Sequence, residues 1–207
     1  EGNGRMCTTL PKVHIAIAGM EKVIPSINNL ADFLHLLPRA ATGQRLTSYV
    51  SLINGPKSSD SIEEPEERHV IIVDNGRSKL LADQQLREAL NCIRCGACLN
   101  ICPVYKAVGG HSYGWVYPGP IGSIVTPVMV GLKKATDLPN ASSLCGACKD
   151  VCPVKINIPH MLLHLRSKIK EDTPKQNISN WIEKFASEVF WQLMKNQTRL
   201  SIAHTIG

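Results

Sequence analysis

Seven of the eight cysteines fall in two short runs, and no other feature of this 207-residue chain restricts its fold and chemistry as strongly. The runs read Cys92-Ile-Arg-Cys95-Gly-Ala-Cys98-Leu-Asn-Ile-Cys102-Pro103 and Cys145-Gly-Ala-Cys148-Lys-Asp-Val-Cys152-Pro153. Four thiols so close together in the first run are poorly placed to pair with one another, because a disulfide needs Cα atoms roughly 5.5 Å apart in a defined orientation. The runs therefore indicate reduced, metal-binding cysteines of a cytoplasmic protein.

The spacing Cys-x2-Cys-x2-Cys-x3-Cys-Pro is typical of a loop that wraps a cubane iron–sulfur cluster. Three thiolates at steps of three residues curl around three iron corners, whereas the fourth cysteine points away and can bind a second cluster. A pair of zinc knuckles is the main alternative, but zinc sites usually use separated Cys-x2-Cys hooks. The spacing therefore predicts iron–sulfur clusters.

The two runs predict two clusters whose ligands are crossed between the runs. The first cluster would take three ligands from the first run and one from the second: Cys92, Cys95, Cys98 and Cys152. The second cluster would take the remaining cysteines of the runs: Cys102, Cys145 and Cys148. Its fourth iron corner would lack a thiolate, because Ser142 stands where a full repeat would have a cysteine.

That open corner leaves several ligand sets possible for the second cluster. Ser142, water or another protein group could bind the fourth iron of a 4Fe-4S cluster, or the iron could be missing, as in a 3Fe-4S cluster. Cys7 is a further candidate for the open corner, but it lies 85 residues upstream of Cys92, and the favoured prediction for it is a small buried hydrophobic residue.

Composition and charge exclude several classes of protein. The formal net charge is +6, and it falls to roughly +2 if each cluster with its thiolates carries about −2. No basic block or aromatic-interleaved stripe indicates a nucleic-acid partner. No stretch of 18 apolar residues predicts a transmembrane helix, and no export signal is visible. Because the chain opens at Glu1 without Met, we expect it to be a piece of a longer protein.

Upstream of the cysteines the apolar pattern predicts an α/β arrangement. A buried strand is expected at residues 13–19 and further strands at 46–53 and 70–73, where apolar residues run together. Helices are expected from Pro25 to Pro38, where the second proline would close the helix, and from Leu80 to Leu90.

The remaining segments are predicted mainly from their composition. Gly2-Asn3-Gly4-Arg5 is expected to be a plain turn, and Arg77 a solvated or structural charge. The 42 residues between the cysteine runs are dense in Gly and Pro, which predicts a packed irregular connection with His111 as a hydrogen-bonded loop residue. Helices are expected near 161–169 and 178–194, so the cluster region would be mostly α-helical.

These segments together resemble the lactate utilization protein B family, the iron–sulfur subunit of a lactate utilization system. The similarity runs in order over nearly the whole chain up to about residue 170. The matching strings are EGNGRM, TLPKVHIAIAGMEKVIP, LLPRAATGQRLTSY, HVIIVDNGRSKLL, CIRCGACLNICPVY, GGHSYG, YPGPIGSIVTP and LPNASSLCGACKDVCPVKINIP.

The resemblance implies an α+β fold class with three regions. Residues 1–80 would be the C-terminal part of an α/β lactate-utilization domain, related in fold to CoA transferases, with its first half missing. Residues 81–170 would be an α-helical ferredoxin domain with two iron–sulfur clusters, and 171–207 a C-terminal helix and tail. The family's ligand pattern agrees with the crossed assignment of the seven cysteines.

The resemblance also implies an electron-transfer subunit that takes part in the oxidation of L-lactate to pyruvate with partner subunits. No nucleophile–base pair or paired carboxylates indicate catalytic residues. The alternative is an enzyme subunit whose incompletely ligated second cluster binds a hydroxy acid through its carboxylate and hydroxyl. A third reading is a structural module in which the clusters only hold the fold.

Overall fold

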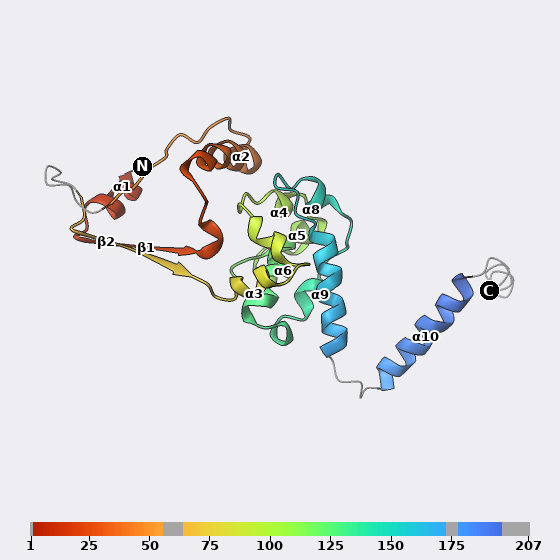
Figure 1. Cartoon of the computed structure of the whole chain (residues 1–207). Helices are drawn as coiled ribbons and strands as arrows, with labels where there is room; N and C mark the ends of the chain where they lie inside the picture. Colours follow the sequence, from red (N-terminus) through yellow and green to blue (C-terminus); the bar gives the residue numbers. More distant parts are fainter. Residues whose placement is uncertain (1, 56–63, 173–177, 196–207) are drawn as a thin grey trace. The chain divides into compact units, whose positions relative to one another are not determined.

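The computed structural model describes residues 2–55, 64–172 and 178–195 (Figure 1). The predicted C-terminal tail from Asn196 onward lies outside the described residues. The chain divides into two compact units, residues 1–167 and 168–207. The first unit contains a small α/β segment and a helical region that carries both cysteine runs.

The α/β segment is built on two parallel strands, β1 (Val13–Gly19) and β2 (Glu67–Val73), paired in register over their whole length. The predicted strands at 13–19 and 70–73 are therefore confirmed. The prediction that the strand at 13–19 is buried was wrong, because Ile15 is 54% exposed and Ile17 71% exposed. Side chains along β1 alternate between exposed and half-buried, so one face of this two-stranded sheet is open to solvent and the other is only partly covered.

Two helices accompany these strands, and both differ from expectation. Helix α1 (Gly2–Thr9) replaces the predicted turn, and the hydroxyl of Thr8 donates to the Gly4 carbonyl at 2.9 Å within it. Helix α2 (Leu30–Thr42) follows the 3-10 turn η2 (Ile27–Asn29) and runs through Pro38. It ends at Gly43, whose left-handed φ of 74° supplies the stop that Pro38 was expected to provide.

The predicted strand over residues 46–53 was wrong, because this segment has no regular structure. Its apolar residues suit a strand, but a strand also needs a neighbour that pairs its backbone N–H and C=O groups. Among the described residues only β1 and β2 pair with each other.

The helical region begins at the turn Asp74–Arg77, where Asn75 and Gly76 have positive φ angles of 41° and 82°. The helix expected from Leu80 to Leu90 is in fact split into α3 (Arg77–Ala82) and the 3-10 helix η3 (Arg87–Asn91). The break lies at Asp83, whose carboxylate accepts a hydrogen bond from the Gln85 amide and stabilises a turn there.

Short helices alternate with tight turns through the rest of the region. In chain order they are α4 (Ala97–Ile101), α5 (Pro103–Val108), η4 (His111–Tyr113), α6 (Gly119–Val130), η5 (Leu132–Lys134), α7 (Asp137–Asn140), α8 (Ala147–Asp150) and α9 (Ile158–Asp172). The prediction of an irregular connection between the cysteine runs was wrong, because α6 is a buried helix there. Its Pro120 lies in the first turn, where the missing N–H costs no helical hydrogen bond.

One hydrophobic core supports both cysteine runs. It joins α6 and α9 with the segment before the first run, and Cys148 and Cys152 of the second run belong to it. Its fully buried side chains include Leu80, Ile124, Ile156, Met161, Leu162 and Leu165. The core therefore fixes the backbone from which the thiols project.

The second unit contains α10 (Ile178–Met194), which confirms the helix predicted there. Several of its apolar side chains are exposed, including Phe185, Val189, Phe190 and Trp191. Across the described part of the chain, no helix combines the length and apolar character that crossing a bilayer requires.

Candidate metal centre

Four cysteines line one cavity of about 140 Å³ in the helical region. Three come from the first run and one from the second: Cys92, Cys95, Cys98 and Cys152. These are the four side chains that the sequence analysis assigns to the first cluster. Most of the other lining residues are apolar, among them Tyr117, Ile121 and Ile156, so the cavity is a sulfur-rich pocket with apolar walls.

The two cysteine runs share one local backbone conformation. The residues before Cys95 and Cys145, Arg94 and Leu144, both have positive φ angles, of 61° and 55°. The glycine that follows each cysteine is also left-handed, and a helix, α4 or α8, begins directly after it. A left-handed residue is least costly at glycine, so the Cys-Gly-Ala-Cys sequence allows the chain to reverse and start a helix around the thiols.

The sulfur of the last cysteine in each run accepts a hydrogen bond from a backbone amide three or four residues later. The sulfur of Cys102 accepts a hydrogen bond from the Tyr105 amide at 3.4 Å, and Cys102 is the N-cap of α5. The sulfur of Cys152 accepts one from the Ile156 amide, also at 3.4 Å. Backbone N–H groups that donate to ligand sulfurs are among the contacts that tune a cluster's reduction potential.

Burial controls the protonation of the thiols in the cavity. Burial raises the pKa of Cys98 to about 12 and also raises the pKa of Cys92. These thiols are therefore neutral near pH 7 unless a metal displaces their protons, as coordination of a thiol does.

The other three cysteines of the runs are brought near one another where α4 packs against α8. Burial raises the pKa of Cys148, and the neighbouring Cys145 and Cys102 raise it further. Cys148 in turn contributes to the raised pKa of Cys98, so the two groups of thiols are neighbours. Cys145 is exposed, and the Ala147 amide and the Ser143 hydroxyl lower its pKa by hydrogen bonding.

Within the described ranges, no three His, Cys, Asp or Glu side chains converge closely enough to hold a single metal ion. A cubane cluster has a separate iron for each thiolate, so its cysteines surround a core of iron and sulfide and need not meet at one ion.

An arginine without a full set of partners lies beside the thiols. Arg94 lines the cavity, and its guanidinium carbon lies 4.2 Å from the centroid of the Tyr117 ring. Its Nη1 is buried and has no hydrogen-bond partner among the described residues. An anionic, sulfide-containing group in the cavity would pair this N–H and take the four thiolates, so the residues present fit an iron–sulfur cluster.

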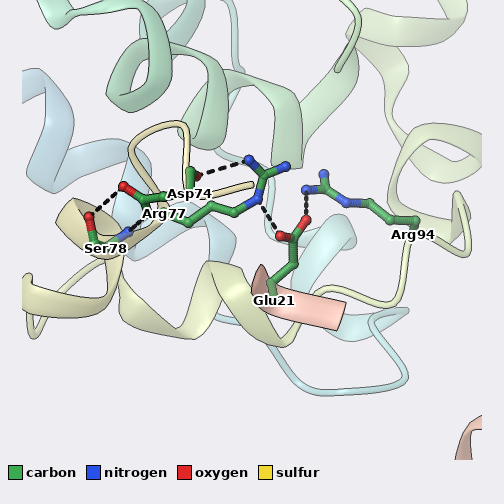
Figure 2. Close-up of polar contacts among 5 residues, drawn as sticks. All are labelled: Glu21, Asp74, Arg77, Ser78 and Arg94. Carbon is green, nitrogen blue, oxygen red and sulfur yellow. Dashed lines mark hydrogen bonds and ion pairs between the residues drawn. The ribbon is translucent and has the colours of Figure 1, made fainter. Parts of the chain in front are cut away.

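Arg94 belongs to a buried ion network that the sequence analysis missed. Figure 2 shows Glu21 between two guanidinium groups, accepting a hydrogen bond from Nε of Arg77 and lying 3.5 Å from Nη2 of Arg94. Arg77 also donates to the Asp74 carbonyl, so it is a buried structural charge. Glu21 lies 56 residues before Arg77 in the chain, and no spacing pattern in the sequence connects them.

The remaining candidates have the following positions. Cys7 is exposed on α1, so the prediction that it is buried was wrong; no residue of that helix is buried. The Ser142 hydroxyl accepts a hydrogen bond from the Leu144 amide at 3.2 Å, whereas it is Ser143 whose hydroxyl contacts Cys145. His111 is exposed at the start of η4. All eight cysteines are free thiols in this structure.

Comparison with known proteins matches both parts of the chain to families. Residues 1–73 match the family model described as a LUD domain, and residues 88–156 match a 4Fe-4S dicluster domain. No solved structure gives a significant match.

Several curated proteins are similar to the chain over most of its length. Lactate utilization protein B of Macrococcus caseolyticus is 52% identical over 172 residues, which are 83% of this chain and 36% of the relative. Lactate utilization protein B of Bacillus subtilis is 48% identical over 190 residues, 92% of this chain and 39% of the relative. The uncharacterized electron transport protein YkgF of Escherichia coli is 50% identical over 171 residues, 83% of this chain and 36% of the relative.

The chain thus spans well under half the length of these relatives. Within that span it has a LUD domain followed by a 4Fe-4S dicluster domain, and its helical region holds the cysteine-lined cavity. The chain therefore combines a LUD domain with a 4Fe-4S dicluster domain and is similar to part of lactate utilization protein B, at 48–52% identity.

Proposed function

We propose that the chain is an electron-transfer component that carries two iron–sulfur clusters and takes part in the oxidation of L-lactate to pyruvate. The observation that supports this most directly is the cavity lined by four thiols from both cysteine runs. The dicluster family match and a relative named as an electron transport protein support the same role. Lactate as the source of electrons rests on the names of the other relatives.

In this proposal the first cluster is bound in the cavity by Cys92, Cys95, Cys98 and Cys152. The second is bound by Cys102, Cys145 and Cys148, with its fourth iron bound by Ser142, Ser143 or water, or missing as in a 3Fe-4S cluster. Bound clusters supply one-electron transfer.

The protein's own residues would shape that chemistry. The apolar walls formed by Tyr117, Ile121 and Ile156 exclude water from the first site, which is one of the factors that set a cluster's potential. The neighbouring positions of Cys98 and Cys148 would keep the two clusters close enough for electrons to pass between them.

Two further parts of the proposal concern the setting of the chain. It would act in the cytoplasm with partner subunits that deliver electrons from lactate and pass them on. Its α/β segment would belong to a domain related in fold to CoA transferases, which is consistent with parallel strands joined through α2.

Metal analysis of the anaerobically purified protein tests the cluster proposal. We expect iron and acid-labile sulfide equivalent to two clusters per chain. In electron paramagnetic resonance (EPR) spectra a 4Fe-4S cluster should give its signal after reduction by dithionite, and a second cluster of the 3Fe-4S type should give its signal in the oxidised protein. Cys152→Ala should lose the first cluster, whereas Cys7→Ala, at the exposed cysteine outside both runs, should keep both. Zinc in place of iron, or full iron content in Cys152→Ala, would contradict the proposal.

The lactate role needs the partner proteins. Co-purified with its partners and kept free of oxygen, the protein should show bleaching of cluster absorbance when L-lactate is added, and the isolated chain should show none. If L-lactate alone perturbs the spectrum of the isolated chain, the cluster binds substrate directly and the electron-transfer role is wrong. If neither preparation responds, lactate is not the donor.

A further inference from the structure

The ion network of Figure 2 connects the α/β segment to the cysteine-lined cavity. Glu21 lies in η1 (Met20–Lys22), directly after β1, and its side chain is only 3% exposed. Burial alone would raise the pKa of Glu21, but the hydrogen bond from Arg77 and the charges of Arg77 and Arg94 outweigh it and lower that pKa. Glu21 is therefore an anion at neutral pH, and it offsets part of the positive charge of the two arginines.

Arg94 is the member of the network that reaches the cavity. It lies between Cys92 and Cys95 in the chain and is itself one of the lining residues. One terminal nitrogen, Nη2, pairs with Glu21, while the other, Nη1, is buried without a hydrogen-bond partner in the described part of the chain. The Arg94 guanidinium also lies over the Tyr117 ring in a cation–π contact. A buried cationic donor in this position is unsatisfied until an anionic group occupies the cavity.

The packing around Glu21 is tight enough to hold this arrangement. A Cβ added at Gly19 would overlap the Glu21 carboxylate and lie 2.7 Å from Nε of Arg77. Gly19 has an ordinary extended backbone, with φ of −68°. Glycine is therefore needed there for the space it leaves to the ion pair.

We propose that Arg94 sets the reduction potential of the first cluster through its charge and its free N–H, and that Glu21 moderates this effect. Both are positioning residues, and the inference rests on the proposed cluster site. Reduction adds one electron to the cluster and makes it more negative, with no bond formed or broken. A nearby positive charge stabilises the reduced form and raises the potential, and a nearby negative charge lowers it.

The test is a potentiometric EPR titration of the full chain, with dithionite as reductant and ferricyanide as oxidant. Arg94→Gln should lower the potential of the first cluster, because it removes the positive charge. Glu21→Gln should raise it, because it removes the offsetting negative charge. We expect a change of about tenfold in the reduction equilibrium in each case, which is about 59 mV for one electron.

Matched controls separate a local effect from a general one. Arg87→Gln and Glu66→Gln remove the same charges at exposed positions and should leave the potential of the first cluster unchanged. The second cluster is an internal reference and should move less than the first in every variant. Arg94→Lys keeps the charge but loses the planar N–H groups of the guanidinium. The potential of the first cluster in this variant should therefore lie between those of wild type and Arg94→Gln.

The results distinguish this inference from the cluster proposal. If wild type binds two clusters and neither Arg94→Gln nor Glu21→Gln shifts the first potential, the inference is wrong and the cluster site stands. Equal shifts of both clusters would also overturn it. If Arg94→Gln fails to assemble the first cluster, the potentials of Arg94→Lys and Glu21→Gln test the inference instead. It is wrong if neither of them shifts the potential of the first cluster. If wild type binds no iron, the cluster proposal itself fails.

Discussion

Two adjacent leucines of α9 provide a direct test of how the core supports the cysteines. Leu162 is fully buried and packs in the cluster of side chains that includes Cys148 and Cys152. Leu163, the next residue on the same helix, is 52% exposed. Replacing each with alanine makes the same chemical change in two different environments.

The expected cost follows from burial. Leu→Ala removes three methylene equivalents, or about 2 kcal/mol of transfer free energy at a buried site, and the cavity left behind raises the total to about 2–5 kcal/mol. Leu163→Ala should cost about 1 kcal/mol or less, because half of its surface already contacts water and alanine is the better helix former. The difference between the two variants is therefore the informative quantity.

The assay is urea unfolding of the anaerobically purified protein, followed by far-UV circular dichroism and by cluster absorbance. With a slope of about 2 kcal/mol per molar urea, Leu162→Ala should lower the midpoint by about 1–2.5 M and Leu163→Ala by about 0.5 M or less. Cluster absorbance should be lost earlier in Leu162→Ala, since the same core holds two of the thiols. Equal midpoints in the two variants would refute the description of α9 as the support of the cluster region.

Three further predictions concern other parts of the first unit. Gly122→Ala should destabilise the protein by about 3 kcal/mol, because the added Cβ would overlap the Tyr117 carbonyl oxygen. Gly4→Ala is the control, since a Cβ there meets open space, and it should leave the stability unchanged. The melting temperatures of the two variants test this, and equal values would refute it. The Arg166 guanidinium donates to the carbonyls of Pro139 and Ser142, in the loop before the second cysteine run, at 2.9 and 2.8 Å. Arg166→Ala should therefore lower the free energy of unfolding by about 2 kcal/mol and reduce the iron content of the second cluster. Unchanged iron would contradict this. Hydrogen bonds from the backbone and side chain of Ser78 lower the pKa of Asp74 below its ordinary 3.8, so the stabilisation from ionised Asp74 is present above that pH and lost as the pH falls further. The difference in unfolding free energy between wild type and Asp74→Asn should therefore shrink in acid. A difference that does not change with pH would refute this prediction.

The sequence was most informative where the chemistry is local. Four cysteines that share one predicted cluster line one cavity, because short spacings and left-handed glycines determine the shape of each loop. The parallel strands were also predictable, since continuous apolar runs are typical of them. In both cases a few neighbouring residues contain the information.

Features that depend on distant partners were not predictable. Residues 46–53 have the composition of a strand, but pairing depends on a neighbour that the segment itself cannot specify. Helix α6 was hidden by its glycines and prolines: Pro120 lies in the first turn, where proline is tolerated, but Pro127 lies inside the helix, where the sequence alone predicts a break. The contact of Glu21 with Arg94 joins segments 73 residues apart and leaves no periodic signal.

The central claim is that two clusters are bound by ligands exchanged between the cysteine runs. Diffraction at the iron absorption edge from anaerobically grown crystals measures this directly. We expect two iron-containing clusters, one bound by Cys152 together with three cysteines of the first run, and the other by Cys102 together with Cys145 and Cys148. Zinc, disulfide bonds, or clusters that each take all their cysteines from a single run would contradict the account.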